Sequence, residues 1–151
     1  TPIPGVIEVI EKLKGGIKIG STTGYTTAMM DIVLPGAATH GYTTDNCVTS
    51  NNLPAGRPQP YMIYQNMIDL ANFRSKRNKI RDTIADIKEG VNAGVWTVGV
   101  ILGSNEMGLT QEETGKLPAE ELNRRMAAVR KRMYMAGAHY VVNTIAELPE
   151  L

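Results

Sequence analysis

The sequence predicts an α/β fold, in which helices cover both faces of a Rossmann-like, largely parallel sheet. Helix-like and strand-like segments alternate along the whole chain, which favours a parallel sheet. Val95–Leu102 is an almost unbroken apolar run, as is typical of a strand buried on both faces. Before it, Ile84, Ile87 and Val91 recur at helical spacing. Gly94 then stands where a helix-ending glycine belongs, so a helix leads directly into the buried strand.

The other elements follow from apolar spacing and from breaking residues. In the first half of the chain, we expect a helix around Val6–Leu13, ended by Gly15 and Gly16, and then a strand at Ile17–Ser21. A helix around Thr26–Val33 should follow, which Pro35 breaks or kinks. After it we expect a weak strand at Cys47–Thr49, an ordered loop at Asn51–Pro60 and a helix marked by Ile63, Met67 and Leu70. In the second half, we expect a strand at Lys79–Asp82, a helix at 84–93, a strand at 95–102 and a polar loop at Gly103–Lys116. A long helix should then begin with Pro118 as its first residue and end at Gly137. A strand at His139–Val142 and a last helix from Thr144 complete the chain's predicted elements.

Length and composition narrow the class of protein. A chain of 151 residues corresponds to about one domain, so residues 1–151 are predicted to form a single domain. The formal net charge of +1 gives no general attraction to nucleic acid or to an anionic membrane. No apolar run approaches the roughly 20 residues that span a bilayer. The single cysteine, Cys47, fits a reducing cytoplasm. We therefore expect a cytoplasmic protein with neither nucleic acid nor membrane as a partner.

The basic residues of the long helix raise nucleic-acid binding as an alternative. They are Arg124, Arg125, Arg130, Lys131 and Arg132. Acidic residues and an apolar stripe are interleaved with them, so a solvated amphipathic helix explains the pattern better.

Polar loops follow the first two predicted strands. In Ser21-Thr22-Thr23-Gly24, the hydroxyls of Thr22 and Thr23 and the amides of the next helix suit a phosphoryl oxygen. Alternatively, one of these threonines only caps the helix. Arg57 lies between prolines in Pro54-Ala55-Gly56-Arg57-Pro58, where an arginine can bind phosphate bidentately or simply face solvent.

A third loop carries Lys79, Asp82 and Asp86. Two carboxylates four positions apart at a helix start suit Mg²⁺, which takes one or two carboxylates together with phosphate oxygens and water. The alternative makes Asp82 the helix cap, Asp86 a first-turn acid and Lys79 a solvated charge. In open α/β sheets ligands bind at the carboxyl ends of the strands, so we expect all three loops to share one edge.

A hydroxyl loop, a basic residue and an aspartate pair on successive strand ends resemble the haloacid dehalogenase superfamily. Longer motifs resemble phosphonoacetaldehyde hydrolase (phosphonatase), a family within it. These motifs are Gly15–Tyr25, Asn52–Pro60, Asp82–Gly90, Asn92–Val100, Gly103–Leu109 and Ala136–Tyr140. The resemblance covers essentially all 151 residues and corresponds to the carboxyl-terminal part of the family's chain.

The resemblance implies a Mg²⁺-dependent hydrolase that cleaves the carbon–phosphorus bond of phosphonoacetaldehyde to acetaldehyde and phosphate. In that family an aspartate on the first core strand attacks phosphorus, and a lysine of the cap domain forms an imine with the aldehyde. The residues expected to bind the phosphonate substrate are Thr22, Thr23, Arg57 and Lys79, and the expected metal ligands are Asp82 and Asp86.

The family's nucleophile strand and its cap domain have no counterpart in this sequence. We therefore expect a partial haloacid dehalogenase-like core with no catalytic nucleophile or imine lysine, inactive by itself. The nucleophile strand would lie between the strands that end at Ser21 and Asp82, so a complementing amino-terminal segment is an expected partner. The family resemblance also implies a homodimer. The alternative function is a degenerate, non-catalytic module that binds phosphate or Mg²⁺. Arg81 stands where the family has a small or acidic residue, beside the expected metal ligand.

Overall fold

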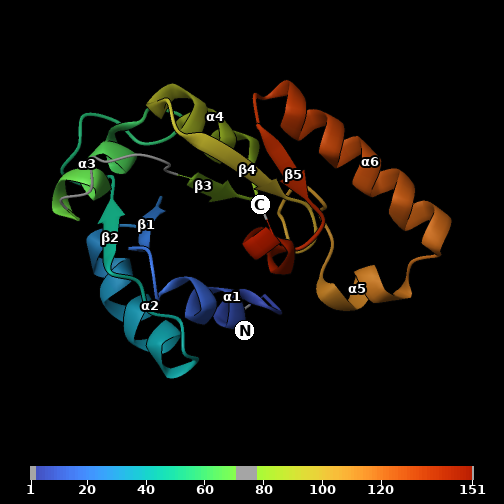
Figure 1. Cartoon of the computed structure of the whole chain (residues 1–151), viewed down its shortest axis with the longest axis horizontal. Helices are drawn as coiled ribbons and strands as arrows, with labels where there is room; N and C mark the ends of the chain where they lie inside the picture. The colour runs from blue at the N-terminus through green and yellow to red at the C-terminus, as the bar shows by residue number, and fades with distance from the viewer. Residues whose placement is uncertain (1–2, 71–77, 151) are drawn as a thin grey trace.

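A computed structural model describes residues 3–70 and 78–150 of the chain (Figure 1). Its elements alternate as the sequence predicts. In order they are α1 (Val6–Leu13), β1 (Gly20–Thr23), α2 (Thr27–Thr39), β2 (Asn46–Thr49), α3 (Tyr61–Asp69), β3 (Asn78–Arg81), α4 (Ile84–Ala93), β4 (Trp96–Val100), α5 (Gln111–Lys116), α6 (Ala119–Met135), β5 (Tyr140–Val142) and the 3₁₀ helix η1 (Ile145–Glu150). The predicted α/β class is confirmed.

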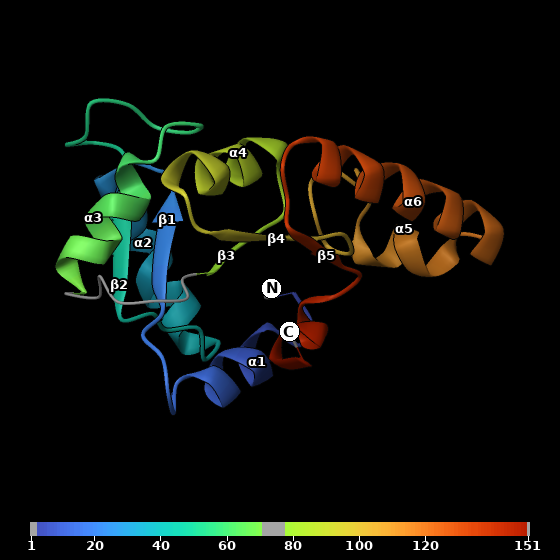
Figure 2. The same cartoon turned by 45° about the horizontal axis from the view of Figure 1, so that its top comes forward.

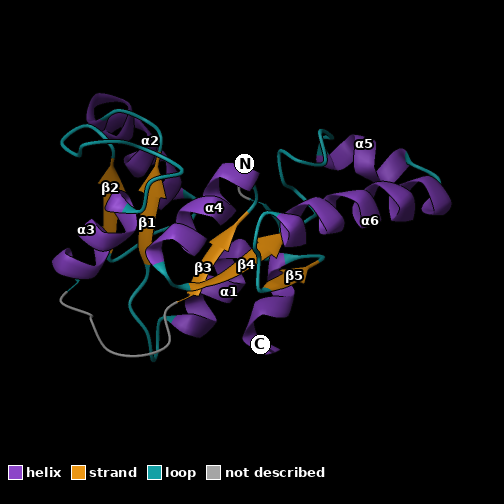
Figure 3. Ribbon diagram, turned by 90° about the horizontal axis from the view of Figure 1, so that it is seen from above, coloured by secondary structure: helices purple, strands orange, loops and turns teal. Residues whose placement is uncertain are grey.

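All the strand pairs described are parallel, and they form two separate ladders. β1 pairs with β2, and β4 lies between β3 and β5. Across the molecule the strands follow the order β2, β1, β3, β4, β5 (Figures 1 and 3). β1 and β3 are therefore the edges that face each other, and within the described residues no strand pairing joins them. This interruption lies where the sequence predicts that a further strand belongs.

Helices lie on both sides of the β3–β4–β5 sheet, as predicted, with α4 and α6 on one side and α1 and η1 on the other (Figure 2). Alternate side chains of β4 point to opposite faces, as in any strand. Val98 and Val100 pack with Val142 against the η1 side. Ile101, directly after the strand, is fully buried in the cluster of α4, α6 and β5. The apolar run is thus a strand covered on both faces.

The ends of α4 fix the approach to the candidate site. Gly94 caps its carboxyl end with φ of 72°, which is the left-handed conformation expected for this glycine. The amino-terminal cap is Thr83, whose Oγ1 accepts a hydrogen bond from the backbone N–H of Asp86 at 3.2 Å. The alternative prediction that Asp82 caps the helix is therefore wrong. Asp86 is a first-turn acid, as that alternative expected.

The structure also corrects several predicted boundaries. α2 runs through Pro35 to Thr39, so the predicted break there is absent. A proline inside a helix removes one hydrogen bond and crowds the preceding turn, but it need not end the helix. The polar loop 103–116 contains α5, whose Thr110 and Glu113 form a capping box. Pro118 is the cap of α6 and not its first residue. The last element is a 3₁₀ helix. Among the described residues, none of the helices is both long enough and apolar enough to cross a bilayer.

Candidate functional site

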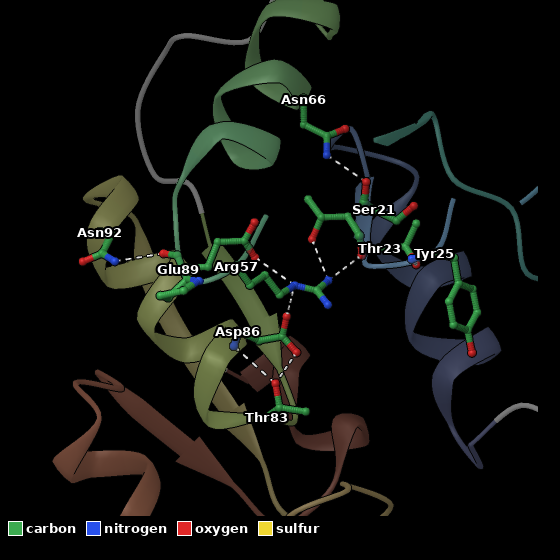
Figure 4. Close-up of polar contacts among 11 residues, drawn as sticks. Ser21, Thr23, Tyr25, Arg57, Asn66, Thr83, Asp86, Glu89 and Asn92 are labelled. Atoms are coloured by element: carbon green, nitrogen blue, oxygen red, sulfur yellow. Dashed lines mark hydrogen bonds and ion pairs between the residues drawn. The ribbon is translucent and has the colours of Figure 1, made fainter. Parts of the chain in front are cut away.

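Arg57 joins the ends of both sheets. It lies in the loop after β2 and reaches Thr22 on β1, together with Asp86 and Glu89 on α4, the helix that follows β3 (Figure 4). Contacts from one side chain to β1 and to α4 require the carboxyl ends of β1 and β3 to lie on the same side of the molecule. The structure thus brings together predicted residues from all three strand-end loops.

The guanidinium of Arg57 is held on two sides. Its Nη2 donates to the backbone oxygen of Thr22 at 2.8 Å and to the Thr22 hydroxyl at 3.2 Å. Its Nε forms ion pairs with the carboxylate of Asp86 and, at 3.3 Å, with Oε2 of Glu89. The side chain of Arg57 is 22% exposed, whereas those of Asp86 and Glu89 are 4% and 0% exposed. Charge-assisted bonds in such a buried place are stronger than at the surface, so the direction of the guanidinium is fixed.

The remaining nitrogen, Nη1, points toward the turn after β1. A β-carbon placed on Gly24 would lie 3.9 Å from it. Within the described part of the chain, Nη1 donates to no acceptor. In the same turn, Thr23 Oγ1 accepts from the backbone N–H of Tyr25 at 3.1 Å, and Thr26 caps α2. The cap of the next helix is therefore Thr26, and neither Thr22 nor Thr23 takes the role that the alternative prediction gave them.

Further bonds fix the loop and the strand that carry these groups. Asn92, near the end of α4, donates to the backbone oxygen of Pro58 at 2.9 Å, which ties the Arg57 loop to α4. Asn66 on α3 donates to the backbone oxygen of Ser21 at 2.8 Å and so holds β1 just before Thr22 (Figure 4). The site is built on regular elements and one braced loop, which favours precise positioning.

The start of α4 is occupied by side chains of the protein. Thr83 Oγ1 donates to Oδ2 of Asp86 at 2.6 Å. Glu106, from the loop after β4, accepts from the backbone N–H of Ile84 at 3.2 Å. Asp82 is half-buried directly after β3, at the edge where the sequence places it. The side chains of Lys79 and Arg81, on which two predictions fall, lie outside the described part of the structure.

A Mg²⁺ site fits this edge only in part. Among the described residues there is no group of three histidine, cysteine or acidic side chains able to hold a metal ion. Mg²⁺ needs only one or two carboxylates when water and phosphate oxygens complete its shell, and Asp82 satisfies that requirement. The carboxylate of Asp86 contacts Arg57 and Thr83. Both metal assignments stay predictions.

Glu89 and Thr83 belong to the site but were missed by the sequence prediction. Glu89 follows Asp86 by three positions, so both lie on one face of α4, and that spacing was a usable signal. A glutamate on a helix normally faces solvent, however, and only the packed structure shows that this one is fully buried.

Comparison with solved structures defines the class of protein. A haloacid dehalogenase-like hydrolase from Bacteroides fragilis aligns with a TM-score of 0.65 and 17% identity, covering 97% of this chain and 59% of that one. A phosphonoacetaldehyde hydrolase-like protein from Oleispira antarctica aligns with a TM-score of 0.93 and 38% identity, covering 98% and 54%. The chain therefore has the core fold of the haloacid dehalogenase-like hydrolases.

Sequence comparison is more specific. A phosphonoacetaldehyde hydrolase from Parabacteroides distasonis is 62% identical over 151 residues, which is 99% of this chain and 57% of that protein. The chain is thus homologous to the phosphonoacetaldehyde hydrolases, and the resemblance predicted from its motifs is confirmed. It spans just over half the length of this relative. No family model matches the chain.

Proposed function

We propose that this chain provides the phosphoryl-binding part of an enzyme that hydrolyses the carbon–phosphorus bond of phosphonoacetaldehyde to acetaldehyde and phosphate. The names of its relatives support this reaction. The proposed phosphonate-binding groups are Arg57, Thr22 and Thr23, with Lys79 as a further cation on β3.

The observation that carries the proposal is a fixed guanidinium whose Nη1 donates to none of the described residues. Two carboxylates and Thr22 hold Arg57, while Nη1 faces the Gly24 turn. A donor that is already oriented loses little entropy when an anion binds. It also needs no reorganisation as charge changes on the phosphoryl oxygens, which is where phosphoryl-transfer enzymes obtain most of their effect.

The charge of a phosphonate calls for more than one cation. Asp82 would hold Mg²⁺, which, when bound, supplies Lewis-acid stabilisation of the phosphoryl oxygens. Arg57 would neutralise and orient the same group from the β1 side. Thr22 fixes Nη2 of Arg57, so its proposed role is to aim the guanidinium as well as to line the site.

We propose that the nucleophile and the imine lysine lie outside the residues of this chain. We propose that a strand between β1 and β3 carries the nucleophile, because both strands present an edge there that the described residues do not pair. Unpaired strand edges bind additional strands readily. An amino-terminal segment would supply this strand, and a second copy of the chain is the other proposed partner. A cytoplasmic location is proposed on the single cysteine alone.

The test is acetaldehyde release from phosphonoacetaldehyde with Mg²⁺, by the chain alone and after addition of the amino-terminal segment of a related hydrolase. Turnover only in the mixture supports the proposal, and Arg57→Lys should reduce it strongly because a lysine cannot reproduce the planar fork. Turnover by the chain alone would show that the nucleophile lies within these residues. Phosphate binding without turnover in the mixture would favour the non-catalytic module.

A further inference from the structure

We propose that Glu89 is a positioning residue for Arg57, which it holds in the rotation that turns Nη1 toward a phosphoryl oxygen. This inference rests on the proposed function, since the bound anion is part of it. Oε2 of Glu89 lies 3.3 Å from Nε of Arg57, and the Glu89 side chain is fully buried. Glu89 lies on α4, one turn after Asp86.

The direction of a guanidinium depends on which of its edges are occupied. Asp86 and Glu89 both approach Nε, and Thr22 takes Nη2. Both carboxylates therefore contact Nε (Figure 4), whereas Thr22 contacts Nη2. With these contacts in place, Nη1 can only project toward the Gly24 turn, where the proposed anion would bind.

The two carboxylates are held differently, which gives Glu89 a role of its own. Asp86 is fixed by Thr83 within the first turn of α4. The Glu89 side chain is more deeply buried than that of Asp86, and it extends from the second turn of α4. Full burial of a glutamate is rare, and a leucine at this position would pack without the cost of removing a charge from water. The contact with Arg57 gives a reason for this charge at this place.

The experiment follows the Arg57 Nε–H resonance by ¹⁵N NMR in the full chain, with inorganic phosphate as the probe. Glu89→Gln keeps the size of the side chain and removes its charge. We expect this variant to shift the Arg57 Nε–H resonance, to accelerate its exchange with water and to weaken phosphate binding about tenfold, because binding must then order a side chain that Glu89 holds in the wild type. The matched control is Glu121→Gln, which removes the carboxylate that pairs with two exposed arginines on α6 and should change neither reading.

A wild-type measurement keeps the test independent of variant folding. Added phosphate should shift the amides of Thr23 and Gly24 while the Arg57 Nε–H resonance stays in place, because the carboxylates keep that edge. Displacement of Nε–H by phosphate would overturn the proposal, as would an unchanged resonance and affinity in a folded Glu89→Gln. If the wild-type chain binds no phosphate, the proposed function fails by itself, and the resonance shift in Glu89→Gln still decides whether Glu89 holds Arg57.

Discussion

The ion pair between Arg57 and Glu89 should contribute measurably to stability, because it links the loop after β2 to the helix after β3. Arg57 is 22% exposed and Glu89 is fully buried. Breaking a buried pair by removing one partner costs about 3–5 kcal/mol. A domain of this kind is stable by about 5–15 kcal/mol, so Arg57→Met should remove a large share of the free energy of unfolding. Glu89→Gln should also destabilise the chain.

A double-mutant cycle separates the pair from all other contacts of the two residues. We expect Arg57→Met and Glu89→Gln together to cost less than the sum of the single changes, by about 1–3 kcal/mol. Urea unfolding measures this coupling energy. The free energy of unfolding falls by about 1–3 kcal/mol per molar urea, so the coupling appears as a clear shift in the urea concentration at the midpoint of unfolding.

An exposed ion pair provides the control for this cycle. Arg124 and Glu121 on α6 form an ion pair whose side chains are 77% and 28% exposed. The cycle of Arg124→Met with Glu121→Gln should give a coupling of about 0.5 kcal/mol or less. Additivity of the Arg57 and Glu89 changes within about 0.5 kcal/mol, or a coupling no larger than that of the control pair, would refute the reasoning.

Three further experiments test other parts of the structure. Thr83→Ala removes the side-chain cap of α4 and should lower the free energy of unfolding, measured with urea, by about 1 kcal/mol. Thr83→Ser keeps a capping hydroxyl and should retain most of that free energy. Gly137 has φ of 107°, and a β-carbon there would lie 2.9 Å from the nearest side-chain atom; Gly137→Ala should destabilise by more than about 1 kcal/mol. Gly115→Ala, in the open part of α5, should be neutral or stabilising, and equal losses at the two glycines would contradict the strain argument. Hydrogen bonds from the backbone and then the side chain of Thr110 lower the pKa of the exposed Glu113. The capping box should therefore stabilise α5 above the ordinary glutamate pKa and lose that effect as the pH falls through the lowered value. An NMR titration should show a higher Glu113 pKa in Thr110→Ala, and an unchanged value would exclude the hydroxyl as a cause.

Local patterns were sufficient to predict the elements around β4. The helical spacing before Gly94 and the apolar run after it depend only on neighbouring residues, and the structure has a helix and a doubly covered strand there. The same reasoning from neighbouring residues predicted a loop where the structure has α5, although Thr110 and Glu113 have the spacing of a capping box. At Pro35 the predicted break is absent, because α2 continues to Thr39.

By itself, the sequence determined the alternation of elements, the parallel class and the segments after the strands that carry Thr22, Arg57 and Asp86, because each of these depends on periodicity, on turn chemistry or on a family motif. Tertiary structure alone decided that the strands form two ladders, that Glu89 is buried and that its charge meets Arg57. Hydrogen bonding between distant strands and the burial of a charged side chain depend on which segments pack together, and no local pattern of residues contains that information.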